Sequence, residues 1–161
     1  MMKQNWKRTL QGALLGAALL AMAGCGSTNV MDTYSFGHQV IRAGQSEITI
    51  ALPYEMGKST KNMSDKGYPI DIYGSVTEHM VIEVEALRPG ENKPLPTVDE
   101  YINHSKSEFA KVGATIKEES VALEGASAKK LDVTVTSQGQ IFRISQYVFL
   151  DHGVLWNIVY Q

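Results

Sequence analysis

Apolar and polar side chains alternate along much of the chain after residue 34, which is the pattern expected of half-buried β-strands. The alternation first predicts a hairpin of strands at 35–43 and 47–52, which turns at Gly44-Gln45 and ends at Pro53. Further strands are predicted at 70–76, 80–86, 115–123, 128–136, 140–150 and 154–160. The last four are joined by turns so short that successive strands must run antiparallel.

A different periodicity predicts one helix that starts at Thr97. Thr97 and Glu100 have the spacing of a capping box, in which each side chain accepts a hydrogen bond from the backbone N–H of the other residue. Apolar residues then fall on one stripe, and Gly113 supplies the stop. The stripe consists of Val98, Tyr101, Ile102, Phe109 and Val112. The helix is therefore expected to pack against the sheet.

The order of these elements, together with three sequence segments, resembles the PsbP/Mog1-like (DcrB-like) domain family. The segments are 47–53 (Glu-Ile-Thr-Ile-Ala-Leu-Pro), the helix start at 97–101 (Thr-Val-Asp-Glu-Tyr) and 121–128 (Val-Ala-Leu-Glu-Gly-Ala-Ser-Ala). The resemblance implies an α+β fold in which helices cover an antiparallel sheet on both sides. It also implies a protein that binds a partner, and the family offers no catalytic residues to carry over.

One departure from this family concerns the end of the sequence. Family members usually continue into a C-terminal helix, whereas this sequence stops at Gln161, directly after its last predicted strand. Either the sequence is truncated, or this protein leaves that sheet face to something else. In the second case we expect an α/β/α sandwich that lacks the C-terminal helix and packs its sheet against one main helix. The open sheet face would expose apolar side chains, which are typical of an interface. These are Phe142, Ile144, Val148, Leu150, Trp156 and Ile158.

The first 24 residues have the pattern of an export signal. Basic residues precede an uncharged, apolar run at 9–23, which as a helix would reach about 22 Å, short of the roughly 30 Å core of a bilayer. Met22-Ala23-Gly24-Cys25 then resembles a bacterial lipobox. This resemblance implies cleavage between Gly24 and Cys25 and a diacylglycerol on the Cys25 thiol. An ordinary secretory signal with an incidental Cys is the alternative.

These features divide the chain into a lipoprotein signal peptide (1–24), a lipidated Cys with its tether (25–34) and one domain (35–161). Stable attachment to a membrane takes at least two acyl chains, which a diacylated Cys25 would provide. The domain is then expected to face the periplasm or the exterior, anchored in the cell membrane or the outer membrane.

Composition narrows the range of partners. The chain has one Cys, so it cannot form an intramolecular disulfide. Removing the three basic residues of the leader from the chain's 15 leaves 12 basic against 17 acidic side chains, a net charge of −5. This charge argues against nucleic acid as a partner of the domain.

No motif predicts catalysis, a cofactor or a metal, so we expect a protein that is not an enzyme. Gly57-Lys58-Ser59-Thr60 resembles the end of a phosphate-binding loop but lacks the glycine required five residues earlier. The histidines are scattered, and no Ser has a Gly-x-Ser-x-Gly context. Glu83 and Glu85 lie on one face of a predicted strand, and we interpret them as its solvent side.

The sequence thus predicts a non-catalytic binding or accessory module for a protein partner in the cell envelope. One candidate surface is a long loop expected at 53–69, which carries Lys58, Lys61 and Lys66. The other is the open sheet face with Phe142, Ile144 and Trp156. The alternative function is a carrier that holds a small apolar ligand between helix and sheet, lined by Tyr101, Phe109, Tyr147 and Trp156. A hydrolase is a more distant alternative, which would need a clustered Ser, His and acid.

Overall fold

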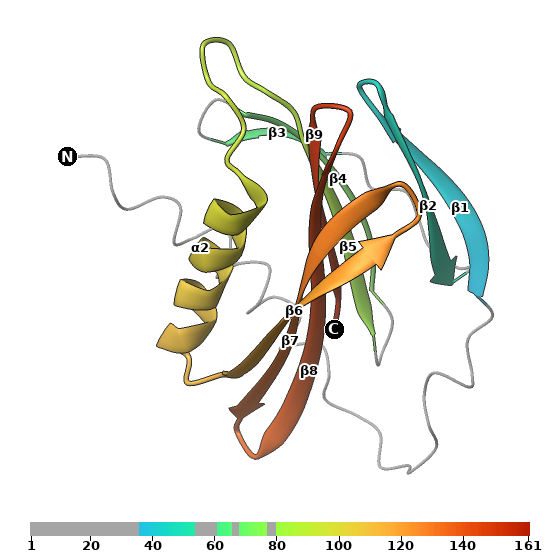
Figure 1. Cartoon of the computed structure of the whole chain (residues 1–161). Coiled ribbons are helices and arrows are strands. Elements are labelled where there is room, and N and C mark those ends of the chain that lie inside the picture. The colour runs from blue at the N-terminus through green and yellow to red at the C-terminus, as the bar shows by residue number, and fades with distance from the viewer. Residues whose placement is uncertain (1–35, 54–60, 66–67, 77–79) are drawn as a thin grey trace.

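The computed structural model describes residues 36–53, 61–65, 68–76 and 80–161 (Figure 1). All strand pairs are antiparallel and form two sheets. The elements are β1 (Phe36–Ala43), β2 (Ser46–Pro53), β3 (Lys61–Asp65), β4 (Tyr68–Val76), β5 (Val81–Leu87), α2 (Val98–Lys111), β6 (Thr115–Leu123), β7 (Ala126–Ser137), β8 (Gln140–Asp151) and β9 (Val154–Tyr160).

The larger sheet has seven strands in the order β3-β4-β5-β9-β8-β7-β6. The chain leaves β5, forms α2, and continues at the far edge with β6 before it returns strand by strand to the centre. As a result β9, the last strand, lies between β5 and β8. The first five residues of β9 are all buried.

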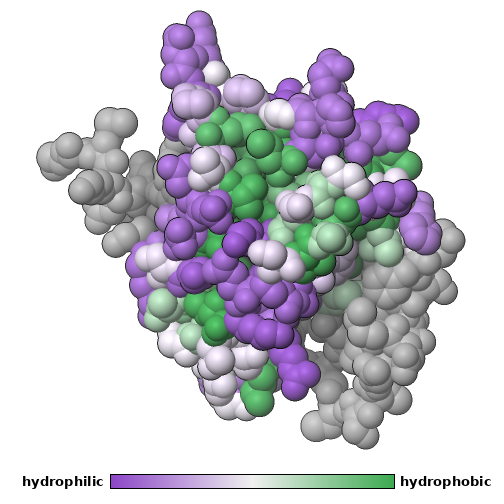
Figure 2. Space-filling view, in the orientation of Figure 1, coloured by the Kyte–Doolittle hydropathy of each residue, from purple (hydrophilic) through white to green (hydrophobic). Residues whose placement is uncertain are grey.

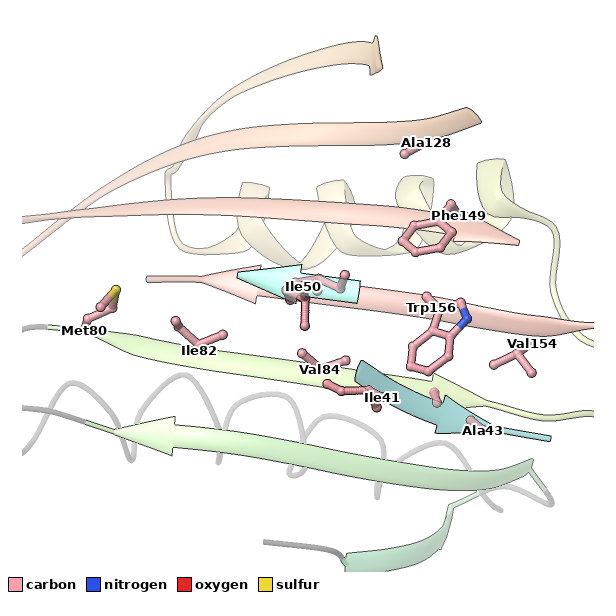
Figure 3. Packing of buried hydrophobic residues seen from close by; sticks show 12 residues of the cluster. Ile41, Ala43, Ile50, Met80, Ile82, Val84, Ala128, Phe149, Val154 and Trp156 are labelled. Atoms are coloured by element: carbon pink, nitrogen blue, oxygen red, sulfur yellow. The ribbon is translucent and has the colours of Figure 1, made fainter. Parts of the chain in front are cut away.

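The two faces of this sheet are covered by different elements. Helix α2 lies over β6, β7 and β8, and the hairpin β1–β2 lies against the opposite face (Figure 1). Figure 3 shows the hairpin side chains Ile41, Ala43 and Ile50 packed over Val84 and Trp156. The cluster under the helix is built instead around Ile102, Phe109, Leu131, Val148 and Leu155.

The expected fold class is therefore wrong. The described chain is mostly β with a single helix, and it is not an α/β/α sandwich. The second covering layer is a two-stranded hairpin whose alternating apolar residues face the sheet. This hairpin closes the sheet face that was expected to be open, so Trp156 and Ile158 are buried beneath it.

The predicted long loop at 53–69 is also wrong in part, because residues 61–65 form β3. This strand pairs with β4, and Met63 lies opposite Ile70. Its sequence, Lys-Asn-Met-Ser-Asp, lacks apolar alternation because β3 is an edge strand of the sheet. Pairing with β4, a tertiary contact, therefore defines the strand.

The predicted helix and its cap are confirmed. The Thr97 N–H donates to Glu100 Oε2 at 2.8 Å, and the Glu100 N–H donates to Thr97 Oγ1 at 3.2 Å. Gly113 follows the helix with a φ of +71°, a conformation that glycine adopts without strain. Ile102 and Phe109 are buried, but Val112 is 57% exposed, so the apolar stripe ends one turn earlier than predicted.

Candidate functional site

The most unusual feature of the core is a chain of polar side chains between α2 and the sheet. Residues of one strand alternate between its two faces, so Glu83 and Glu85 of β5 both lie on the side of α2. Asn157 of β9 is the residue directly opposite Glu85. Gln146 of β8 and Ser105 of α2 complete the chain, and both are buried.

Hydrogen bonds connect these residues into one network. Glu85 Oε2 accepts from the Tyr101 hydroxyl at 2.9 Å and from Asn157 Nδ2 at 2.8 Å. Gln146 Nε2 donates to Asn157 Oδ1 at 2.8 Å and to Ser105 Oγ at 3.2 Å. The network therefore links the helix to three neighbouring strands, β5, β9 and β8.

The electrostatics of this network centre on Glu83. Burial raises the pKa of Glu83 to about 7, and the charge of Glu85 and a hydrogen bond to it act in the same direction. Burial and the same two carboxylates raise the pKa of Tyr101 well above its ordinary value. A carboxyl group with a pKa near 7 holds or releases its proton within the physiological range.

The interpretation of Glu83 and Glu85 as a solvent-facing pair is therefore wrong. The alternation along β5 did not predict the burial of these two residues, because a strand that is polar on one face usually exposes that face. The available signal lay elsewhere, in Gln146 and Asn157, which lie between apolar residues on the α2 side of β8 and β9. Buried amides need partners, and Glu85 is the partner of Asn157.

A second polar cluster contains a Ser, an Asp and a His. The Ser46 hydroxyl donates to Asp151 Oδ2 and accepts from Trp156 Nε1 at 2.8 Å, while His152 Nδ1 lies 2.8 Å from Asp151 Oδ1. In a hydrolase the His stands between Ser and Asp and takes the proton of the nucleophile. Here Asp151 stands in the middle, and Ser46 is only 2% exposed.

This second cluster is therefore a structural latch and not a nucleophile with its base. Ser46 begins β2 directly after the turn of the first hairpin, and Asp151 ends β8 directly before the turn into β9. The hydrogen bonds join these two turns to each other and to the indole N–H of the buried Trp156. The arrangement gives no support to the hydrolase alternative.

The predicted site residues that the structure describes do not form one surface. Gly24, Cys25, Lys58 and Lys66 lie outside the described residues, and Lys61 is the first residue of β3. Ile144 is buried under α2 and Trp156 is buried under the hairpin, whereas Phe142 is half-buried. The expectation that Ile144 and Trp156 are exposed is wrong.

The aromatic residues proposed to line a ligand pocket are also separated. Tyr101 and Phe109 lie on the α2 side of the sheet, and Trp156 and Tyr147 belong to the cluster on the hairpin side. The seven-stranded sheet stands between the two pairs. These four side chains therefore cannot line a single cavity between helix and sheet.

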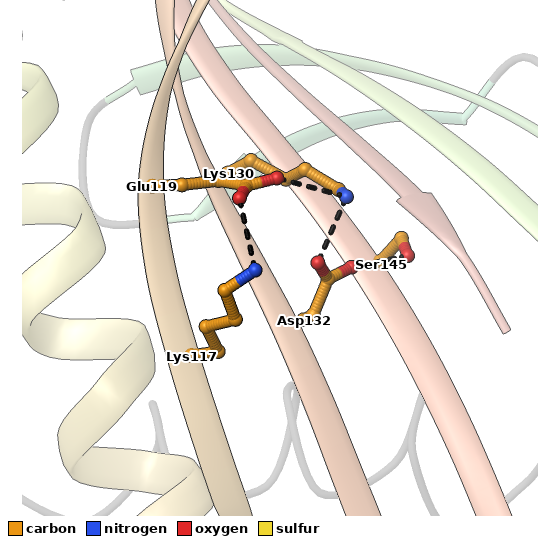
Figure 4. A network of polar contacts seen from close by, with 5 residues as sticks. All are labelled: Lys117, Glu119, Lys130, Asp132 and Ser145. Carbon is orange, nitrogen blue, oxygen red and sulfur yellow. Dashed lines mark hydrogen bonds and ion pairs between the residues drawn. The ribbon is translucent and has the colours of Figure 1, made fainter.

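Charged side chains follow β6 and β7 on the sheet face beside the hairpin. Figure 4 shows these side chains. Lys117 Nζ lies 3.2 Å from Glu119 Oε2, and Lys130 Nζ lies 3.2 Å from Glu119 Oε1 and 2.8 Å from Asp132 Oδ2. Ser145 of β8 donates to Asp132 at 2.8 Å. Hydrogen bonds from Lys130 and Ser145 lower the pKa of Asp132, and the hydrogen bond to Asp132 is the largest of the causes that raise the pKa of Lys130. Charges of both signs on an edge strand such as β6 oppose pairing with another strand.

Among the residues that the structure describes, no three His, Cys, Asp or Glu side chains are grouped so that they could hold a metal ion. In the same part of the chain, no helix is both long and apolar enough to cross a bilayer.

Comparison with known proteins yields a distant structural similarity. No family model matches the chain, and no curated protein matches it. Among solved structures, it is similar to a protein of unknown function, PA94, from Pseudomonas aeruginosa. The identity is 13% and the TM-score 0.40, with 76% of this chain and 81% of that chain covered.

Proposed function

We propose that this protein is a lipoprotein anchored in a bacterial envelope membrane, whose extracytoplasmic domain is a non-catalytic binding or accessory module for another envelope protein. The observation that carries the proposal is the sequence Met22-Ala23-Gly24-Cys25, which closes an apolar leader and contains the single Cys of the chain. A diacylated Cys25 would hold the domain at the membrane, because two acyl chains exceed the marginal attachment of one.

The partner surface is proposed on the sheet face beside the hairpin, over β6, β7 and β8. Lys117, Ile141 and Arg143 are exposed there, and Ile141 is 65% exposed. This proposed partner surface comprises Lys117, Glu119, Asp132, Ile141 and Arg143. Charges of both signs next to an apolar side chain suit a protein surface better than a polyanion.

The hydropathy of the visible surface agrees with a limited interface. Hydrophilic side chains cover most of the face seen in Figure 2, and an apolar area lies near the N-terminal end of α2. A mixed surface of this kind is typical of partners that associate reversibly, since obligate interfaces are more apolar. We therefore propose a transient contact.

The anchor is tested by the mass and location of the protein in a bacterial host. Wild type should carry diacylglycerol on Cys25 and sediment with membranes, whereas Cys25→Ser should retain its leader and lack the lipid. Ser27→Ala is the matched control, because it changes a neighbouring small residue and should leave the lipid mass unchanged. An unmodified Cys25 thiol in the wild type would refute the anchor.

The partner surface is tested by photo-crosslinking on intact envelopes. A photoreactive residue at Ile141 or Arg143 should give one discrete heterologous adduct, and the same residue at Ser107 on the outer side of α2 should not. The substitution Arg143→Glu should reduce the yield of the Ile141 adduct several-fold. Equal labelling at all three positions would contradict this surface.

A further inference from the structure

The two carboxyl groups of β5 lie side by side without a basic partner across the sheet. Ile72 and Gly74 of β4 are opposite Glu85 and Glu83, and Asn157 and Val159 of β9 are opposite them on the other side. None of these neighbours carries a charge. Both carboxyl groups are only partly exposed, and they hydrogen-bond each other.

We propose that Glu83 and Glu85 share a single proton beneath helix α2, and that loss of this proton loosens the first half of the helix from the sheet. The donors of the network converge on Glu85, which accepts from Tyr101 and Asn157. Glu83 then carries the shared proton and donates a hydrogen bond to Glu85. When that proton leaves, two adjacent carboxylates remain in a site of low polarity and repel each other.

The second negative charge acts on the helix through Tyr101. Its hydroxyl donates to Glu85 at 2.9 Å from the first turn of α2, and Ser105, one turn later, accepts from Gln146. Both hydrogen bonds belong to the network that the second negative charge disturbs. The last turn of α2 is held separately by Phe109 in the apolar cluster. The first half of the helix should therefore respond more than its end.

Among the residues that the structure describes, few other titratable groups lie beside the pair. From α2, the relevant residues are Tyr101 and His104, which lie one turn apart. From β8 the nearest member is the neutral Gln146, and the positions of β4 and β9 beside the pair are uncharged. His104 is thus the group near the pair whose titration must be separated from that of Glu83, since an ordinary His titrates near pH 6.5.

The direction of the pH effect follows from the raised pKa of Glu83. The ordinary pKa of this carboxyl group is 4.5, and its pKa in the folded chain is about 7. Protonation of Glu83 therefore adds to the free energy of unfolding. This contribution is complete below pH 4.5, decreases as the pH rises toward 7, and is absent well above pH 7. This titration does not depend on the proposed function, although an extracytoplasmic location would expose it to the pH of the surroundings.

The test compares hydrogen exchange and urea unfolding of the full chain in a neutral detergent at pH 5, 6, 7 and 8. In the wild type, the unfolding equilibrium constant should rise on the order of a hundredfold from pH 5 to 8. Amide protection at 98–105 should fall more than at 106–111, after correction for intrinsic exchange. Glu83→Gln keeps a donor toward Glu85 but has no proton to lose, so its profile should be nearly flat over this range.

Two matched variants and one direct measurement complete the test. Glu124→Gln, in an exposed turn, and His104→Asn should both retain the wild-type slope. A slope that survives in Glu83→Gln, or disappears in His104→Asn, would overturn the proposal. If Glu83→Gln does not fold, the wild-type side-chain carboxyl resonances decide, since one Glu must titrate near pH 7 and midpoints below pH 5 for all Glu would refute it.

Discussion

At the scale of single residues, the described core is notable for its buried polar side chains. Ser46, Ser105, Gln146 and Asn157 are each at most 5% exposed. All four have hydrogen-bond partners on other elements, as expected for buried polar groups. They do not add to the apolar driving force, but they join the helix to the strands and the hairpin to the last turn.

The latch at Ser46 gives a prediction at this scale. Ser46→Ala leaves Trp156 Nε1 buried without this acceptor and removes the donor to Asp151. An unsatisfied buried donor costs about 1–3 kcal/mol, so the free energy of unfolding should fall by that amount in urea titrations. Ser127→Ala, an exposed position on β7, is the control and should change stability by less than about 0.5 kcal/mol. Equal effects of both substitutions would argue against the latch.

The tyrosine of the helix gives a second prediction. Tyr101→Phe keeps the ring but removes a donor to the Glu85 carboxylate. A hydrogen bond to a charged group contributes about 1.5–3 kcal/mol, and stability at pH 7 should decrease within that range. Tyr68→Phe removes an exposed hydroxyl that donates to the Pro94 carbonyl, and it should cost clearly less. A loss at Tyr101 no larger than at Tyr68 would show that the network adds no stability.

At the scale of elements, helix α2 combines a local start signal with tertiary attachment. Its capping box satisfies free N–H groups at the first turn, and Asp99 and Glu100 place negative charge near the positive end of the helix dipole. Lys106 of the helix lies 2.7 Å from Glu118 of β6, a surface ion pair of small energetic value. Packing of Ile102 and Phe109 therefore holds the helix in place, and the cap decides where it begins.

The cap is tested by Thr97→Ala. The substitution removes the acceptor for the Glu100 N–H, and N-cap replacements of this kind cost about 1 kcal/mol. Ser107→Ala removes a hydroxyl from the exposed side of the same helix and should be neutral or slightly stabilising, because alanine has the higher helix propensity. Thermal unfolding followed by circular dichroism at 222 nm distinguishes the two. A Thr97→Ala variant as stable as the wild type would contradict a role of the cap.

At the scale of the whole molecule, one sheet is covered by a helix on one face and a hairpin on the other. Neither cover can fold independently, since an isolated two-stranded hairpin and a short helix are both marginal in water. Trp156, with no exposed surface, is buried by the hairpin and not by its neighbours in sequence. Hairpin docking should therefore be cooperative with formation of the sheet.

Docking of the hairpin is tested with two substitutions in the same hairpin. Ile50→Ala removes a buried side chain over the sheet and should cost about 2–5 kcal/mol, with earlier exposure of Trp156 in urea seen as a red shift of fluorescence. Val40→Ala, at a position that is 49% exposed, should change little. Both are made in a Trp6→Phe background, so that Trp156 is the single fluorophore of its kind. A larger loss of stability at Val40 than at Ile50 would mean that the opposite face of the hairpin packs against the sheet, and would contradict this arrangement.

Local patterns predicted the elements well because their causes are local. The hairpin turn at Gly44, the cap at Thr97 and the last four strands with their turns all appear where the alternation and the turn residues indicated. Strand β3 was missed because its five polar-rich residues form a strand only when β4 is beside them. The open sheet side was mispredicted because nothing in the alternation of β1 and β2 says which face of which sheet they cover.

The sequence by itself determined where the helix and the described strands other than β3 lie, and it carries the leader and Cys25 on which the proposed anchor depends. Only the tertiary structure decided that β9 lies at the centre, that a hairpin covers the sheet face expected to be open, and that Glu83 and Glu85 lie half-buried on the side of α2. The physical reason is that burial and pKa depend on neighbours distant in the chain. Asn157 and Tyr101 contact Glu85 only when β9 is paired with β5 and α2 is packed on the sheet.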